Sequence, residues 1–84
     1  MKFGEFVDII DNTDRDRTAT SVIYKGLSIM REYIPEADIH ASGHDVVYSV
    51  TVQELVDAGI SKYDVLQLAA LGWRIDFESM AHFV

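Results

Sequence analysis

The sequence predicts a small α+β domain, in which N-terminal helices precede an antiparallel sheet of two β-hairpins that flank two short helices. Three observations predict this class: apolar residues recur at helical spacing before Pro35, short runs rich in β-branched residues follow it, and the last segment alternates between apolar and charged residues. With 84 residues, of which 49% are hydrophobic, the chain has room for one core. We therefore expect residues 1–84 to form a single globular domain.

Two helices are expected before the proline. Apolar residues at helical spacing over 3–10 predict a short first helix, which ends near the polar cluster 11–14. An apolar stripe over 19–34 predicts a second helix of about five turns, which ends at Pro35 because proline cannot continue a helix. Gly26 lies on this stripe. It either lets another element approach closely or is merely tolerated in the helix at about 1 kcal/mol.

A β-hairpin is expected after the proline. The runs 39–41 and 46–50 are rich in β-branched residues, and the polar stretch 42–45 separates them. In this turn Gly43 would adopt a positive φ, and Asp45 would hydrogen-bond the loop backbone. The expected hairpin tip comprises Gly43, His44 and Asp45.

Two short helices are expected between the hairpins. Thr51 and Glu54 have the spacing of a capping box, which would open a helix over 52–58 that Gly59 ends. Ser61 with Asp64 repeats this capping pattern more weakly and would open another helix over 62–71, which Gly72 ends. Because apolar residues surround most of this last helix, it is either the most buried helix of the fold or it faces a partner.

The segment that follows Gly72 is expected to form the second hairpin. Apolar and charged residues alternate there, as they do in a strand with one buried face. A turn at 78–79 would return the chain as the last strand. The apolar positions of the first strand are Trp73, Ile75 and Phe77.

The composition excludes several classes of function. With no cysteine, the chain can form no disulfide, no thiolate zinc site and no thiol nucleophile, and a reducing compartment such as the cytoplasm is the simplest expectation. No apolar run is long enough to span a membrane, and the acidic residues near the N-terminus are not typical of a signal peptide. The net charge is −7, and residues 35–84 carry only Lys62 and Arg74 against eight acidic residues. Because phosphates are bound by basic residues, nucleic acid is not the expected partner.

The stretch ASGHDVVY raises the question of a reactive or metal site, because His44 and Asp45 are adjacent. Adjacent residues of a strand point to opposite faces, so Asp45 would not orient His44 as a catalytic base. A metal site would require His40 and His44 to converge across the turn with a third ligand, such as Asp38, Asp45 or His82. The pair Asp76 and Glu78 has no pattern of a general acid and base. We therefore expect no catalytic residue, no metal and no cofactor.

The segment 55–72 suggests a known architecture. Two short helices joined across Gly59-Ile60-Ser61 and followed by a hairpin resemble a helix-turn-helix with a wing, and the spacing is also similar to helix-hairpin-helix modules. Both resemblances imply DNA binding. The charge opposes it, because Lys62 is accompanied by Asp64, and Arg74 by Asp76 and Glu78.

A second resemblance covers about half of the chain. The pattern Leu68-x-x-Leu71-Gly72-Trp73, with Asp76 and a terminal Phe83, resembles a recurrent ending among small proteins of phages and other mobile elements. The run 43–48 resembles the hairpin that tends to precede this ending. The resemblance implies a small α+β protein without an assigned activity, and it implies no catalytic residue.

These observations lead us to expect a non-enzymatic protein-binding module with an acidic surface. The negative charge of such a surface would attract a basic partner. One example is a nucleic-acid-handling host or defence protein, whose DNA-binding groove a phage-type inhibitor would occupy. The residues expected at this surface are Asp57, Asp64, Trp73, Arg74, Asp76 and Glu78. Two alternatives are a winged-helix-like DNA-binding regulator, which would use the basic residues of 15–31, and a structural homodimer formed through the helix 62–71.

Overall fold

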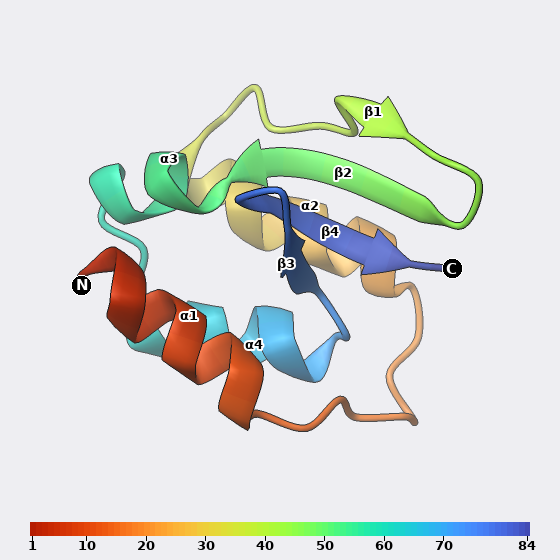
Figure 1. The fold of residues 1–84 in the computed structure, drawn as a ribbon, viewed down its shortest axis with the longest axis horizontal. Coiled ribbons are helices and arrows are strands. Elements are labelled where there is room, and N and C mark those ends of the chain that lie inside the picture. Colours follow the sequence, from red (N-terminus) through yellow and green to blue (C-terminus); the bar gives the residue numbers. More distant parts are fainter.

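Four helices and a four-stranded antiparallel sheet make up the computed structural model, which describes residues 1–84 (Figure 1). The helices are α1 (Phe3–Asn12), α2 (Val22–Tyr33), α3 (Val52–Asp57) and α4 (Lys62–Ala70). The strands are β1 (Ala41–Ser42), β2 (Val46–Thr51), β3 (Arg74–Asp76) and β4 (Ser79–Phe83), in the order β1-β2-β4-β3. The predicted fold class is confirmed: two helices come first, and two short helices separate the two hairpins.

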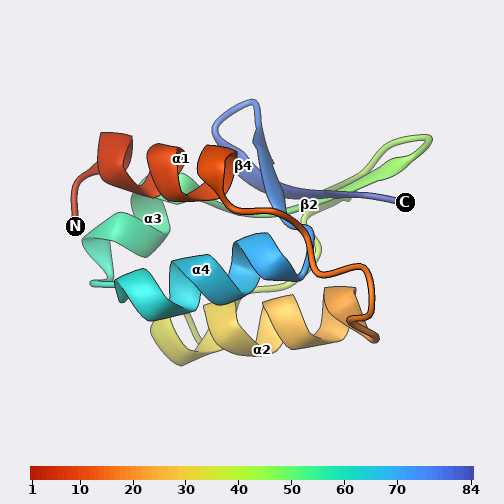
Figure 2. The same cartoon turned by 90° about the horizontal axis from the view of Figure 1, so that it is seen from below.

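The helices lie against the sheet with α4 between α1 and α2 (Figure 2). The first helix contacts three elements that are distant from it in sequence, namely α3, α4 and β3. Its buried side chains are Phe6 and Ile10, which have exposed fractions of 0% and 1%. None of the four helices has the length and apolar character needed to cross a membrane.

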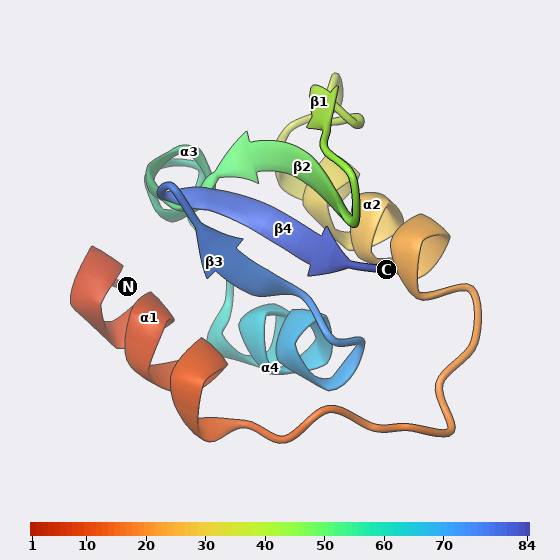
Figure 3. The same ribbon diagram turned by 45° about the vertical axis from the view of Figure 1, so that its right-hand side comes forward.

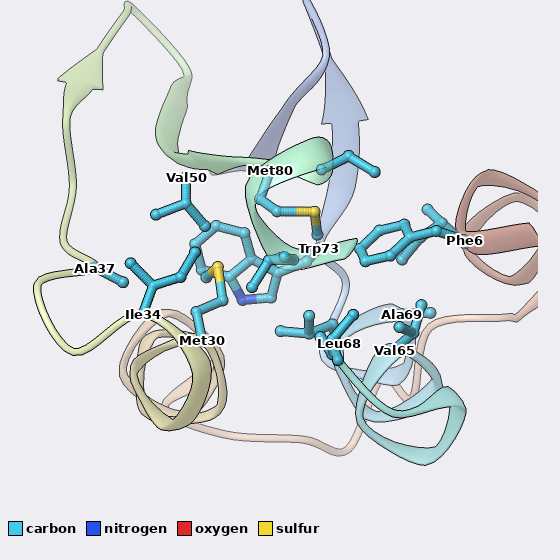
Figure 4. Close-up of a cluster of buried hydrophobic side chains, with 14 of the residues drawn as sticks. Phe6, Met30, Ile34, Ala37, Val50, Val65, Leu68, Ala69, Trp73 and Met80 are labelled. Carbon is cyan, nitrogen blue, oxygen red and sulfur yellow. The ribbon is translucent and has the colours of Figure 1, made fainter. Parts of the chain in front are cut away.

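The core is organised around Trp73, which lies just before β3 and is fully buried (Figure 4). Its indole Nε1–H donates a hydrogen bond to the carbonyl oxygen of Val22 at 3.0 Å. The ring lies so close to Gly26 of α2 that a Cβ atom at this position would be 2.0 Å from Nε1. Of the two alternatives left open for Gly26, the close approach is therefore the one observed, and its partner is an aromatic ring from the other end of the chain.

The predicted starts and ends of the two short helices are confirmed. Thr51 and Glu54 form a complete capping box, in which each side chain accepts a hydrogen bond from the other residue's backbone N–H. At the helix ends, Gly59 and Gly72 have φ angles of +83° and +91°, the left-handed conformation that favours glycine. Ser61 caps α4 by accepting a hydrogen bond from the backbone N–H of Asp64.

The second helix begins three residues later than the apolar stripe predicts, because the segment before it makes other hydrogen bonds. The backbone N–H of Asp16 donates to the carbonyl of Ala70 at 2.8 Å, which ties this segment to the end of α4. The Asp16 carboxylate in turn accepts bonds from the hydroxyl and the backbone N–H of Thr18, and these bonds hold the pKa of Asp16 below its ordinary value. The chain then enters α2 through Ser21, whose φ is +52°.

The first hairpin is confirmed, but its turn differs from the prediction. The chain reverses over 43–45, and the backbone N–H of Gly43 donates to the carbonyl of Val46 at 2.8 Å. Gly43 does not have a positive φ, so that part of the prediction is wrong. Asp45 holds the loop through its backbone carbonyl, which accepts from the N–H of Val84, and not through its carboxylate.

Candidate functional site

From α2 onward, a helix and a hairpin (α2, β1, β2) come first. Two helices joined by a tight turn (α3, α4) follow, and then a second hairpin (β3, β4). The last strand returns to pair with β2, so that β4 lies between β2 and β3 (Figure 3). The two short helices and the hairpin that the resemblance to a helix-turn-helix with a wing predicts are thus present, and the β3–β4 turn is the segment that this resemblance would make the wing.

The exposed side of α4 differs from the surface that helix-turn-helix proteins use for DNA. In such proteins the second helix of the pair enters the major groove with its exposed side chains. In this chain α1 packs along α4 and also contacts β3, so it covers the side of the molecule where these two elements adjoin. The side chains that α4 leaves exposed are Lys62, Tyr63 and Leu66. With a single cation among them, this helix has little with which to bind phosphates.

The four predicted carboxylates do not form one cluster. Asp64 lies in the first turn of α4 and accepts a hydrogen bond from the hydroxyl of Tyr33 at the end of α2. Asp57 accepts from the side-chain amide of Gln53 at 2.8 Å, on the exposed face of α3. Asp76 lies on β3, and Glu78 follows it in the β3–β4 turn. Of the four carboxylates, Asp76 and Glu78 are therefore the two that belong to one hairpin.

Asp76 is joined to β2 by a bond that spans the sheet. The hydroxyl of Tyr48 reaches past β4 and donates to the Asp76 carboxylate at 2.7 Å. This hydrogen bond stabilises the protonated phenol, so it raises the pKa of Tyr48 above its ordinary value of 10.0, and desolvation and the nearby negative charge act in the same direction. Asp76 therefore has a structural partner within the domain.

Two of the predicted binding residues have internal roles. The prediction that Trp73 contributes to a binding surface is wrong, because its side chain is fully buried in the core. The guanidinium of Arg74 donates to the carbonyls of Trp73 at 2.9 Å and Ala69 at 3.2 Å. A cation beside the last carbonyls of α4 is favourable because these groups carry the negative end of the helix dipole. Arg74 thus caps the C-terminal end of α4 within the domain.

The turn between β3 and β4 is the most unusual part of the surface. Asp76 pairs with Ser79, so only Phe77 and Glu78 form the turn, one residue earlier than predicted. Their φ angles are +49° and +63°. Two successive positive φ angles are typical of a type I′ turn, which favours Asn-Gly. A bulky residue in this conformation is an outlier. The side chain of Phe77 is 87% exposed. The sequence pattern placed Phe77 on the buried side of a strand and missed this position.

The histidines do not converge. His44 lies in the exposed tip of the first hairpin, with no hydrogen bond to Asp45. His82 is buried, with an exposed fraction of 2%. Its ring meets the Trp73 ring edge-on, with 5.4 Å between the ring centroids, and its Nε2 lies 3.0 Å from the carbonyl oxygen of Leu71. Because a carbonyl only accepts, Nε2 carries the proton there, and the buried Nδ1 has no partner. No group of three His, Cys, Asp or Glu residues lies together as metal ligands would.

The comparisons with known proteins give no relative. No family model matches the sequence, no curated protein matches it, and no solved structure matches the fold.

Proposed function

We propose that this chain is a non-enzymatic protein-binding module that docks through an acidic surface onto a basic protein. The observation that carries the proposal is the distribution of charge on the folded surface. Of the fourteen acidic residues, all except Asp64 and Asp76 are exposed. A single ion pair is formed, between Arg31 and Asp38 at 3.4 Å. Nearly all of the negative charge is therefore available to a partner.

Charge also supports the class of partner. A surface with this excess of carboxylates attracts Lys and Arg side chains and repels phosphates, so it steers encounters toward basic proteins. Proteins that handle nucleic acids have basic grooves of this kind. The resemblance of the C-terminal half to small phage proteins agrees with a role as an inhibitor or modulator of such a host or defence protein.

The two short helices and the hairpin after them favour one competing function, a winged-helix DNA-binding regulator. A recognition helix and a wing bind DNA through cations, whereas the turn of the wing carries Phe77 and Glu78 here. Of the basic residues of 15–31, which this function would use, Arg31 is paired with Asp38. A gel-shift assay with duplex DNA at low salt separates the two functions. We expect no shifted band. A shift that disappears as the salt concentration rises would support DNA binding and contradict the proposal.

The proposal is tested by affinity capture with the tagged chain from a lysate of the source cell, with and without nuclease. We expect a protein that survives nuclease treatment and elutes as salt is raised. Recovery of nucleic acid alone, or of a second copy of this chain alone, would contradict the proposal; the second result would indicate the structural homodimer.

A pair of charge-matched variants makes the test specific. Asp57→Asn with Glu78→Gln removes two of the predicted carboxylates and leaves Asp64 and Asp76 bonded to their tyrosines. Asp11→Asn with Glu32→Gln removes the same charge from exposed positions of α1 and α2. We expect the first variant to bind more weakly and with a smaller salt dependence than the second. Equal binding by both would show that the predicted carboxylates do not contact the partner.

A further inference from the structure

We call the turn of Phe77 and Glu78 the wing tip. Its phenylalanine is the most exposed large hydrophobic residue of the molecule. Phe77 is 87% exposed, against 70% for Tyr24 and 52% for Phe83. No buried contact of Phe77 compensates for its left-handed backbone, which is unfavourable by about 1–2 kcal/mol for a residue with a Cβ atom. The stability of the fold therefore does not explain a phenylalanine at this position.

The wing tip is held in place by bonds at its base. The backbone N–H of Val52, at the start of α3, donates to the carbonyl of Glu78 at 3.0 Å. On the other strand, Asp76 is fixed by the hydroxyl of Tyr48. Below the turn, Met80 and Ala81 of β4 are fully buried. The backbone of Phe77 is consequently held at a fixed position, so a partner that binds this residue has little backbone conformational entropy to remove.

The surroundings of the wing tip are acidic. Glu78 belongs to the tip itself, and Glu54 lies beside it, because its carboxylate is bonded to Thr51, which pairs with Ser79. Neither 46–61, which forms β2 and α3, nor 75–84, which contains the tip, includes a lysine or arginine. An aromatic side chain with carboxylates around it fits an apolar pocket with a cationic rim.

We infer that Phe77 is the anchor of the interaction, and that it inserts into an apolar pocket of the partner protein bordered by Lys or Arg side chains. This inference rests on the proposed function and adds the point of contact and the chemistry of the partner's site. A buried aromatic anchor within a polar rim is the arrangement in which a few residues carry most of the binding energy. A phosphate backbone or an anionic membrane would be repelled by Glu54 and Glu78.

The decisive variant is Phe77→Asn, because it removes the anchor without damaging the fold. Asparagine tolerates the left-handed conformation and is favoured in type I′ turns, so the variant is expected to be at least as stable as the parent chain. Phe83→Asn is the matched control, since it makes the same change at an exposed phenylalanine at the opposite end of β4. The probe is the protein recovered by the parent chain from the nuclease-treated lysate, purified and titrated by calorimetry.

We expect Phe77→Asn to weaken the affinity for this protein at least tenfold, and Phe83→Asn to change it less than threefold. If the parent chain recovers a protein that Phe77→Asn binds equally well, the inference about the wing tip is overturned while the proposed function stands. If the parent chain recovers no protein, or only nucleic acid, both are overturned. Capture alone supports neither the anchor nor the pocket.

The chemistry of the pocket is tested by placing the photoreactive side chain benzoylphenylalanine at position 77. After irradiation with the same purified protein, we expect cross-links to apolar residues that have Lys or Arg beside them in the partner's structure. Cross-links to a pocket without cationic side chains would overturn the assignment of the partner's site, even if Phe77 proved to be the anchor.

Discussion

The two hairpins of the sheet place left-handed backbone where their residue types predict the opposite. The turn of the first hairpin contains Gly43, yet none of its residues has a positive φ. The turn of the second contains no glycine, yet both Phe77 and Glu78 have positive φ. The residue types therefore favour left-handed backbone in the first turn, which does not adopt it, and disfavour it in the second turn, which does.

The difference lies in how deeply each hairpin is anchored. In the second hairpin Trp73, Met80 and Ala81 are fully buried, so the core fixes the register and leaves two residues for the turn. In the first hairpin Ala41 and Ser42 are exposed, so the core does not fix the register of β1 or the length of the turn. An unfavourable backbone persists only where the surrounding structure determines it, and here the core of the second hairpin does so.

The largest expected effect comes from disturbing the packing of Trp73 against Gly26. In Gly26→Ala the new methyl group would overlap the indole of Trp73, and we expect a loss of about 3 kcal/mol in the free energy of unfolding. Gly4→Ala is the matched control: this helical glycine has open space around it, so we expect a gain of about 0.5–1 kcal/mol. Urea unfolding monitored by the fluorescence of the single tryptophan measures both. Equal effects of the two substitutions would refute the role of the close approach.

The next effect is a gain in stability at the wing tip. The double substitution Phe77→Asn with Glu78→Gly supplies the residues that a type I′ turn favours, and we expect the free energy of unfolding to rise by about 1–2 kcal/mol. In the other hairpin, Gly43→Ala is expected to change it by less than about 0.5 kcal/mol, because φ is not positive there. Thermal unfolding compares the two. A loss of stability in the first variant would show that the turn is not strained.

A smaller effect is expected in the capping box beside the wing tip. Thr51→Ala removes the N-cap of α3 and should reduce stability by about 1 kcal/mol. The backbone N–H of Thr51, and then its hydroxyl, hold the pKa of Glu54 below its ordinary value of 4.5. Glu54 therefore contributes stability above pH 4.5 that is lost as the pH falls through its lowered pKa. The stability difference between the parent chain and Glu54→Gln, measured by denaturant unfolding, should accordingly shrink below pH 4.5; a difference that persists there would contradict this origin.

Residue types near one another in sequence were sufficient to predict much of the fold. The capping box at Thr51 and the helix ends at Gly59 and Gly72 depend on local chemistry. At Gly26 the helical stripe left two alternatives open, because the contact that decides between them comes from the distant Trp73. The late start of α2 was not predictable in this way, because it depends on a bond between Asp16 and the distant Ala70.

The candidate site was less predictable for the same reason. Asp64 and Asp76 were identified as surface charges, but their tyrosine partners lie 31 and 28 residues away in sequence. Trp73 and Phe77 were placed on one face of a strand, whereas one is in the core and the other in the turn. A shift of the turn by one residue separates them, and such registers are decided by burial rather than by local pattern.

The smallest expected effect concerns the bond that ties the wing to the rest of the sheet. Tyr48→Phe removes the hydroxyl that donates to Asp76, and we expect a loss of stability smaller than that of Thr51→Ala. Because folding raises the pKa of Tyr48 above 10.0, the bond contributes fully below pH 10.0, and its contribution is lost as the pH rises through the raised pKa. The stability difference between the parent chain and Tyr48→Phe should therefore be constant near neutral pH and disappear in strong alkali. Ultraviolet titration of the parent chain and of Tyr48→Phe should show that the group removed by the substitution ionises above pH 10.0. If it ionises at or below pH 10.0, the bond to Asp76 does not persist in solution, and the wing tip is held by the bond from Val52 and by the buried strand β4.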